Sequence, residues 1–377
     1  MNIKRAYKFR FYPTPEQEQV LAQTFGCARF VYNYMLRVRT DAWFQRSEKV
    51  GYHDTSALLT ALKKDPQYAW LGEVSSVPIQ QALRHLQTAF NNFFAKRAQY
   101  PSFKSKHGRQ SATYAASAFR WDGKVLYLAK MKEPLNIRWS RTIPKAAKVS
   151  TVSVSKDPAG RYFVSLLCED CVAPKPAVKS KVGIDLGLSH FAVLSNGEKI
   201  AAPNTLRRYE KRLGVLQRRL SKKQKGSNNR AKARKKVARL HAKIADTRKD
   251  FLHKLSTRLI RENQAIAVET LSVKNMQKNR HLSKSISDAS WSEFLRQLEY
   301  KAHWYGRELI GIDRWYPSSK RCSNCGHVEA KMPLFKRQWT CPECNTNHDR
   351  DINAARNILA AGLAVTVCGE NVSPVSL

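Results

Sequence analysis

The sequence predicts a chain of several domains, in which an α/β domain follows a strand-rich part and a helical part. Aromatic and basic residues alternate at positions 7–11, which is typical of a strand with one buried face and one basic face. Apolar residues recur at helical spacing from about residue 14 to about residue 100. Buried strands then occur at residues 182–188 and 265–269, with helical sequence between and after them, and this order indicates an α/β domain.

The charge of the chain indicates a polyanionic partner. The 377 residues include 67 Lys and Arg against 29 Asp and Glu, which gives a net charge of +38. A surplus of this size repels itself in a compact protein, so it favours nucleic acid as the partner. The first residues hold no apolar run, and the longest apolar stretch, residues 358–367, is too short to cross a bilayer. We therefore expect no membrane contact and a cytoplasmic location.

The first helix has a clear start signal. Thr14 can cap the helix, Pro15 suits its first turn, and Gln17 completes a capping box. A further helix is predicted after Pro78. More polar, strand-like sequence follows from about residue 110 to residue 172, and the proline-containing residues 173–176 are typical of a linker.

Cations are concentrated in residues 205–250, which hold 18 Lys and Arg but 3 Asp and Glu. Leucines at helical spacing on either side of residues 226–229 predict a pair of basic helices. Two ordinary solvated helix faces are the alternative, although such faces usually mix both signs of charge. The candidate cations for contacting nucleic acid are Lys8, Arg10, Arg218, Arg219, Lys222, Lys223, Arg234, Lys235 and Lys236.

Two glutamines are candidates for reading a short DNA motif. Gln80 and Gln81 lie on the helix predicted after Pro78, and a glutamine side chain can pair with adenine in the major groove. An ordinary polar helix surface is the alternative interpretation.

Three carboxylates occupy positions that a core would not ordinarily tolerate. Asp185 and Glu269 each belong to an apolar strand, and Asp351 lies at the start of an alanine-rich helix. A buried carboxylate is costly without a cation, a donor or a proton. Oxygen ligands suit Mg²⁺, and two such ions about 4 Å apart can activate water and stabilise the leaving oxygen of a phosphodiester. Taken singly, each acid could instead be a turn former, a helix cap or the partner of a Lys or Arg.

Four of the eight cysteines form two C-x-x-C pairs. Cys322 and Cys325 make the first pair, Cys341 and Cys344 make the second, and 15 residues lie between the pairs. This spacing is typical of a zinc ribbon with four thiolate ligands. No ligand position is left open, so we expect a structural Zn²⁺ ion. Cys168 and Cys171 have the same local spacing but no second pair, and we interpret them as strand or loop residues.

Five segments carry a resemblance to a known family. They are residues 7–14, 103–106, 183–187 (Gly-Ile-Asp-Leu-Gly), 268–276 and 349–357 (Asp-Arg-Asp-Ile-Asn-Ala-Ala-Arg-Asn). The sequence resembles the TnpB (OrfB) proteins of bacterial insertion sequences, which are relatives of the single-nuclease CRISPR effectors. The last three segments resemble the three motifs of a RuvC nuclease and contain Asp185, Glu269 and Asp351, with Asp349 as the lesser candidate in the third motif.

The resemblance implies an RNase H-like RuvC nuclease domain with an inserted zinc ribbon, preceded by an oligonucleotide-binding-type β-barrel with a helical insertion. The expected ranges are 1–13 and 109–172 for the barrel, 14–108 for the helical insertion, 173–180 for the linker, 181–320 and 346–377 for the nuclease domain, and 321–345 for the ribbon. It also implies Mg²⁺ or Mn²⁺ as the catalytic metal, a guide RNA from the mobile element, double-stranded target DNA, and a monomer with one RNA in a bacterial cell.

Two other functions compete with an RNA-guided DNA endonuclease. One is a transposase or recombinase accessory protein that works without RNA. Transposases of the DD(E) type place Glu last, whereas this chain ends its acidic series with Asp351. The other is a DNA-binding regulator without catalysis, which the loss of Asp185 or Glu269 would have favoured, and both acids are present.

Overall fold

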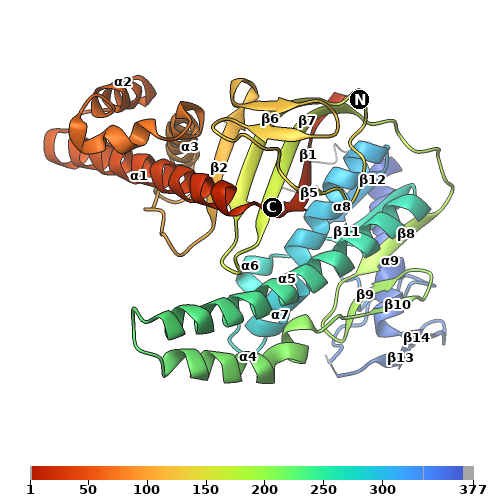
Figure 1. The fold of residues 1–377 in the computed structure, drawn as a ribbon. Coiled ribbons are helices and arrows are strands. Elements are labelled where there is room, and N and C mark those ends of the chain that lie inside the picture. Colours follow the sequence, from red (N-terminus) through yellow and green to blue (C-terminus); the bar gives the residue numbers. More distant parts are fainter. Residues whose placement is uncertain (1, 334, 368–377) are drawn as a thin grey trace. The chain divides into compact units, whose positions relative to one another are not determined.

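The computed structural model describes residues 2–333 and 335–367. The last ten residues of the range expected for the nuclease domain, 368–377, lie outside the described residues. The chain divides into an N-terminal unit, Asn2–Cys171, and a C-terminal unit that begins at Val172. Each unit has its own hydrophobic core, and each is described separately (Figure 1).

The N-terminal unit is built on a five-stranded antiparallel sheet in the order β2-β6-β7-β1-β5. The bounds are β1 Asn2–Phe11, β2 Gln110–Ala115, β5 Ile137–Arg138, β6 Lys148–Lys156 and β7 Tyr162–Cys171. A short helix η2 (Ala116–Ala118) leads into a hairpin of β3 (Phe119–Trp121) and β4 (Leu126–Leu128). The hydrogen-bonded ladders of the described residues follow an open order from β2 to β5, so they do not by themselves make a closed barrel.

Strand β1 has the two faces that its alternating sequence predicts. Tyr7, Phe9 and Phe11 are buried in the core, while Lys8 is exposed. The aromatic side chains therefore hold β1 in one register against β7, with ten paired positions from Asn2–Cys171 to Phe11–Tyr162.

The helices of the N-terminal unit lie between β1 and β2 in the sequence. They are α1 (Pro15–Arg46), α2 (Tyr52–Leu62), η1 (Pro66–Gly72) and α3 (Ser76–Phe94), and they share a core of their own. The capping box that starts α1 is confirmed, because Gln17 N–H donates to Thr14 Oγ1 and Thr14 N–H donates to Gln17 Oε1. The Gln17 side chain also donates to the carbonyl groups of Glu133 and Pro134, which joins the start of α1 to the sheet's connecting segment.

The C-terminal unit contains a mixed five-stranded sheet in the order β10-β9-β8-β11-β12. The bounds are β8 Lys181–Asp185, β9 His190–Leu194, β10 Lys199–Ala201, β11 Ala265–Glu269 and β12 Glu308–Ile312. Strands β8, β11 and β12 are parallel, and the hairpin expected at residues 195–197 joins β9 to the antiparallel strand β10. The prediction of an α/β domain is thus confirmed.

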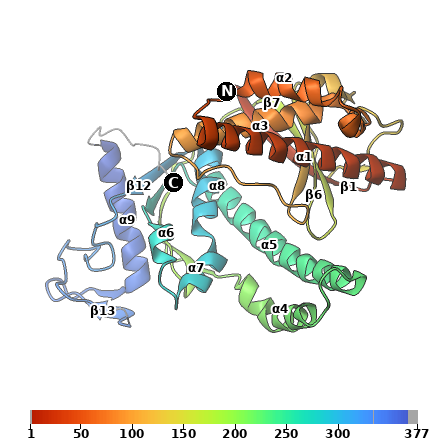
Figure 2. The same cartoon turned by 90° about the vertical axis from the view of Figure 1, so that its left-hand side faces the viewer.

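Helices cover both faces of this sheet. Helices α5 (Asn228–Glu262) and α8 (Trp291–Tyr305) pack on the face that presents Ile184, Ile266 and Val268. Helix α9 (Arg350–Val367) packs on the other face, against Ala267 and Ile312. Figure 2 shows the strands lying between α9 and α8.

Helices α4 (Thr205–Ser221) and α5 form the predicted basic pair and lie side by side as an antiparallel hairpin (Figure 1). Leu213, Leu240 and Ile244 are buried between them, so the leucine faces hold the pair together. Short helices α6 (Val273–Met276) and α7 (Ser283–Ala289) follow β11, and strands β13 (Gln338–Thr340) and β14 (Asn347–Asp349) pair just before α9. None of the helices described here is long and apolar enough to cross a membrane.

Candidate active site and four-cysteine cluster

The three candidate carboxylates come from three different elements of the C-terminal unit. Asp185 ends β8, Glu269 ends β11, and Asp351 lies in the first turn of α9. Strands β8 and β11 are neighbours and parallel, with Ile184 opposite Val268, so their carboxyl ends and the two acids meet at one edge of the sheet. The topology therefore brings together residues that are more than eighty positions apart in the sequence.

Strand periodicity places the two strand acids on the face covered by α9. Successive side chains alternate between faces, so Asp185 shares a face with Gly183, and Glu269 shares a face with Ala267. Gly183 faces α9 so closely that a β-carbon there would lie 2.1 Å from Ala355 O and 2.6 Å from Leu359 N. Gly362 brings α9 equally near to β11, because a β-carbon there would lie 2.7 Å from Ala267 Cβ. Two glycines thus set the depth at which α9, with Asp351, rests on the sheet.

The three carboxylates act on one another electrostatically. Desolvation by burial and, to a lesser extent, the negative charges of Glu269 and Asp351 together raise the pKa of Asp185 to about 7, although Arg350 and Arg337 oppose the rise. A carboxyl group that is partly desolvated beside two others favours a proton or a cation. The donor set, three carboxylates at the open end of parallel strands, therefore fits hard divalent cations such as Mg²⁺.

Asp349 and Asp351 have different surroundings, which separates their roles. Asp349 Oδ1 accepts hydrogen bonds from the N–H groups of Asp351 and Ile352, and its Oδ2 is 2.6 Å from Lys199 Nζ. Burial would raise the pKa of Asp349, but the hydrogen bonds from Lys199 and from Ile352 N–H more than offset this and lower it. Asp349 therefore caps the start of α9, whereas the carboxylate of Asp351 pairs with Arg337 and its charge acts on Asp185.

Two further side chains contact the carboxylates and were not anticipated from the sequence. Ser318 Oγ donates a short hydrogen bond to Glu269, and Arg337 Nη1 lies 3.2 Å from Asp351 Oδ1. Ser318 is buried and follows β12, while Arg337 precedes β13 in the cysteine-rich insertion. Neither residue belongs to a local pattern, so no sequence signal could have identified it.

The four cysteines converge as their spacing predicts. Cys322 Sγ is 3.6 Å from Cys344 Sγ, and Cys325 Sγ is 3.6 Å from Cys341 Sγ. Sulfurs bound to zinc at ~2.3 Å in a tetrahedron lie ~3.8 Å apart, so the cluster is compatible with a zinc ion. The ligand atoms of the four cysteines all lie within 4.8 Å of one another. Within residues 2–333 and 335–367, no other group of three or more His, Cys, Asp or Glu side chains converges in this way, so the three carboxylates lie less tightly together than the cysteines. Cys168 and Cys171 belong to β7, as the strand interpretation expected.

One histidine connects the cysteine cluster to the carboxylates. His348 is buried, its Nε2 is 3.0 Å from Cys322 Sγ, and its ring packs on Trp339. It directly precedes Asp349 and the start of α9. Asn353 strengthens the same connection, because its side chain donates to Arg321 O and accepts from Ser323 N–H. The first turn of α9 is therefore fastened to the first cysteine pair.

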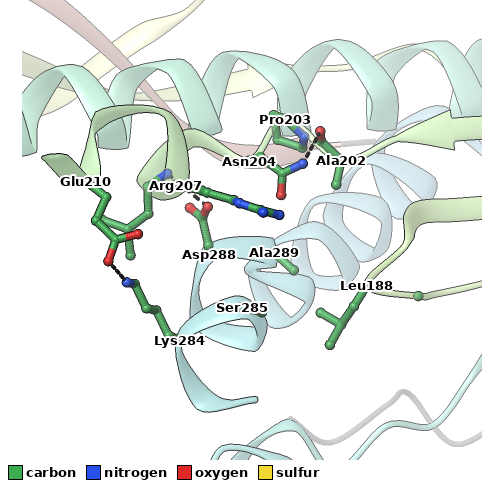
Figure 3. A pocket seen from close by; sticks show the side chains of 12 residues that line it. Leu188, Ala202, Pro203, Asn204, Arg207, Glu210, Lys284, Ser285, Asp288 and Ala289 are labelled. Carbon is green, nitrogen blue, oxygen red and sulfur yellow. Dashed lines mark hydrogen bonds and ion pairs between the residues drawn. The ribbon is translucent and has the colours of Figure 1, made fainter. Parts of the chain in front are cut away.

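A pocket of about 270 Å³ opens beside the carboxyl end of β8 (Figure 3). Its lining begins at Gly187, two residues after Asp185, and its residues Leu188, Ala202 and Ala289 pack against the core on the α5–α8 face of the sheet. Asp288 on α7 organises the opposite wall by accepting hydrogen bonds from Thr205 Oγ1 and Leu206 N–H and pairing with Arg248. Figure 3 shows the exposed Arg207 side chain extending across the pocket. Within the described part of the chain, the guanidinium group of Arg207 has no hydrogen-bond or ion-pair partner.

The structure places the candidate nucleic-acid contacts at the surface of their units. On the α4–α5 pair, all of the predicted cations are exposed: Arg218, Arg219, Lys222, Lys223, Arg234, Lys235 and Lys236. A groove between these helices is lined by further cations that were not singled out, Arg212, Arg239 and Lys243, beside Arg219 and Lys236. In the N-terminal unit, Lys8 and Gln80 are exposed, and Arg10 and Gln81 are half-buried.

Comparisons with known proteins agree with this architecture. Family models match residues 151–280 (OrfB, described as a probable transposase), 291–358 (a Cas12f1-like TNB domain) and 1–48 (a helix-turn-helix domain). A Streptomyces pristinaespiralis protein named "Putative RNA-guided DNA endonuclease" is 58% identical, over 99% of this chain and 92% of the relative. The chain belongs to the TnpB (OrfB) family. The InsQ protein of Escherichia coli (strain K12), with the same descriptive name, is 34% identical to this TnpB-family chain over 99% of it and 96% of the relative.

Solved structures resemble the TnpB-family chain in fold. A Cas12f1 chain from a complex with single guide RNA and target DNA matches with a TM-score of 0.57 at 14% identity, covering 95% of this chain and 98% of the other. The mini-RNA-guided endonuclease CRISPR-Cas_phi3 matches with a TM-score of 0.53 at 9% identity, covering 99% and 93%. Residues 1–48 do not form two helices around a turn here, because α1 runs unbroken from Pro15 to Arg46 after strand β1.

Proposed function

We propose that this TnpB-family protein is an RNA-guided, divalent-metal-dependent DNA endonuclease of a mobile element, and that it cuts by RuvC-type hydrolysis. The observation that carries the proposal is the meeting of Asp185, Glu269 and Asp351 at one sheet edge, where burial and the neighbouring charges raise the pKa of Asp185 to about 7. Such a perturbed carboxyl cluster beside a pocket is typical of a catalytic site.

Asp185, Glu269 and Asp351 would hold the catalytic metal, with Asp349 serving as the helix cap. Two bound Mg²⁺ or Mn²⁺ ions would activate water and stabilise the leaving 3′ oxygen of the phosphodiester. The chain's own residues orient these ligands. Ser318 fixes the Glu269 carboxylate through its hydrogen bond, and Arg337 neutralises part of the charge of Asp351.

The pocket beside β8 would position the DNA strand. Because its lining begins two residues after Asp185, the pocket would hold a nucleotide near the scissile phosphate. Arg207 would contact a neighbouring phosphate there, because a guanidinium group binds phosphate oxygens in a fixed fork geometry. The apolar side chains of Leu188 and Ala289 line the same pocket.

The names of the relatives and the charge of the chain support RNA as the source of sequence specificity. Two relatives are named RNA-guided DNA endonucleases, and a net charge of +38 exceeds what one cleavage site needs. In such proteins base pairing reads sequence, while the protein reads backbone and duplex shape. The four-cysteine cluster would hold one structural Zn²⁺ ion that stabilises the insertion before α9.

Removal and exchange of the bound RNA test the proposal. The purified protein is expected to carry RNA through moderate salt, and RNase treatment before DNA is added should abolish site-specific cutting. A changed guide segment should move the cut to a matching new site. An Asp185→Asn protein, which keeps the cationic surfaces, serves as the control that binds the DNA without cutting it.

Specific cutting that survives complete removal of RNA would contradict the proposal and favour an RNA-independent transposase. Specific binding without cutting in Mg²⁺ or Mn²⁺ by the unmodified protein would instead favour a regulator. Chelation by EDTA should stop cleavage and leave RNA binding in place.

A further inference from the structure

A cavity of about 720 Å³ in the N-terminal unit is flanked by two tryptophans. Trp121 ends β3, and Trp139 directly follows β5. The remaining wall is formed by Gly123, Lys124 and the segment 140–145. None of these residues belongs to the carboxylate site, the cysteine cluster or the α4–α5 pair, so the cavity is a separate feature of the N-terminal unit.

The ring of Trp139 is both anchored and accessible. Its centroid lies 4.8 Å from the ring of Phe9, which is 2% exposed in the core, and 5.2 Å from the ring of Trp121. Trp139 itself remains 38% exposed. A large ring held by core contacts on one side and open on the other is a preformed stacking surface. In residues 2–333 and 335–367, neither indole N–H of the pair has a hydrogen-bond partner, so both remain able to donate to a ligand.

The charged side chains that line the cavity are all cations. Lys124, Arg141 and Lys145 line it, and no acidic residue does. Asp122 is not part of the lining, and its Oδ1 accepts hydrogen bonds from the N–H groups of Val125 and Lys124, which lower its pKa and keep it ionised. The Arg141 guanidinium group lies over the rings of Tyr7 and Phe9, 5.3 Å and 5.7 Å from their centroids, which keeps this cation beside Trp139.

Aromatic faces interleaved with cations match the chemistry of an unpaired nucleotide. Every base has a π-face that can stack on an aromatic side chain, and the adjoining phosphates require positive charge. A paired base offers no free face inside a duplex, whereas loops and single-stranded ends of RNA do. An apolar peptide would leave the three cations without a partner.

We propose that this cavity binds an unpaired nucleobase of the RNA that the protein carries, stacked on Trp139, with its flanking phosphates contacted by Arg141 and Lys145. The inference deepens the proposed function, because it assigns one contact to the RNA partner. It places this contact on the N-terminal unit, whereas the cations of residues 205–250 belong to the C-terminal unit.

The test uses the full-length protein reconstituted with its own RNA. Trp139→Ala should weaken RNA binding by about 5- to 150-fold, the range that loss of one base–aromatic stack produces. Trp139→Phe should lose less, because a ring remains. Trp43→Ala is the matched control, since Trp43 is 49% exposed on α1 in the same unit but lies outside the cavity. Chemical probing of the bound RNA should show one unpaired nucleotide that is protected in the wild-type and Trp43→Ala complexes and reactive in the Trp139→Ala complex.

A second variant guards against misfolding. Trp139→Ala removes a contact with Phe9, so thermal unfolding is measured alongside binding, and Arg141→Gln changes an exposed residue with little expected effect on the core. Arg141→Gln should weaken RNA binding and reduce its salt dependence by roughly one phosphate contact.

Three results would overturn the inference. The first is that Trp139→Ala has the same RNA affinity and nucleotide protection as Trp43→Ala, and the second is that Arg141→Gln leaves RNA binding unchanged. The third is that the protected nucleotide belongs to added DNA. These results leave the proposed function untouched if cutting by the wild-type protein still requires RNA. Cutting by the wild-type protein without RNA would contradict the proposed function itself.

Discussion

A single methyl group at Gly183 should separate Asp351 from Asp185 and Glu269, the carboxylates that we propose to be catalytic. In the Gly183→Ala protein the new β-carbon would lie 2.1 Å from Ala355 O and 2.6 Å from Leu359 N, the two ends of one turn of α9. Ordinary contact begins at about 3.4 Å, so α9 has to move by about 1.3 Å or lose that turn. Overpacking of this kind costs about 1–3 kcal/mol, which lowers the melting temperature of a unit of this size by roughly 2–12 °C.

The rate of DNA cleavage by Gly183→Ala should fall by more than the loss of folding stability would explain. Displacement of α9 moves Asp351 away from Asp185, and a misplacement of ~1 Å at a reacting centre costs about 100-fold in rate. The assay measures guided DNA cleavage at a temperature where circular dichroism shows the variant to be folded. Gly214→Ala in α4 is the matched control, because a β-carbon there would meet nothing within 4 Å, and it should leave cleavage unchanged and add ~1 kcal/mol of stability. Wild-type cleavage and stability in Gly183→Ala would refute the close packing of α9 on β8.

Three further perturbations have defined outcomes. Glu269→Gln and Asp351→Asn should each reduce the rate of DNA cleavage by more than about 100-fold while DNA binding is retained. Asp349→Asn should reduce the cleavage rate by less than about tenfold. Equal losses of cleavage rate at positions 349 and 351 would contradict the assignment of Asp349 as helix cap and Asp351 as metal ligand. Elemental analysis should find one zinc ion per chain, and a Cys322→Ser, Cys341→Ser protein should lose both the zinc and the cleavage activity. An active protein without zinc would contradict the structural role of the ion. Burial lowers the pKa of Lys301 from 10.5 to about 8. Between these pH values the unfolded state therefore binds more protons than the folded state. The free energy of unfolding should then rise with pH by up to ~3 kcal/mol from about pH 8 to pH 10.5. Urea unfolding should show that this rise disappears in Lys301→Met, and an identical pH dependence in both proteins would exclude Lys301 as its source.

Features encoded in contiguous sequence could be predicted, and they include the strand acids. Glu269 ends a short apolar run, and Asp185 lies within the run 182–188, although β8 itself ends at Asp185. Parallel neighbouring strands bring such strand ends to one edge. The capping box at Thr14 and the leucine faces of the basic helices likewise depend on residues within one or two turns of each other. The cysteine spacing predicts the cysteine cluster for the same reason, because the geometry of a zinc site restricts the length of the loop within each pair.

Contacts between distant segments left no trace in the sequence. Ser318 bonds Glu269 across 49 residues, and nothing near either residue marks the pairing. The short helices α6 and α7 were not anticipated, because each is only a few residues long and shows no periodic pattern. The hydrogen bonds of Asp288 hold α7 to the start of α4, and no sequence signal marks them. The Trp121–Trp139 pair is also tertiary, since it requires the β3–β4 hairpin to fold against the end of β5.

The three carboxylates lie on β8, β11 and α9, which the ribosome synthesises in that order, and this order determines when the cluster can form. Asp185 emerges first, but the cluster is incomplete until Asp351 has been translated and α9 has packed on the sheet. At about 5–20 residues per second, that interval lasts roughly 10–30 s. During it the nascent chain already displays the cations of α4 and α5 and can engage nucleic acid, yet it lacks one of the three proposed metal ligands. Chains released before α9 should therefore be harmless to the genome that encodes them.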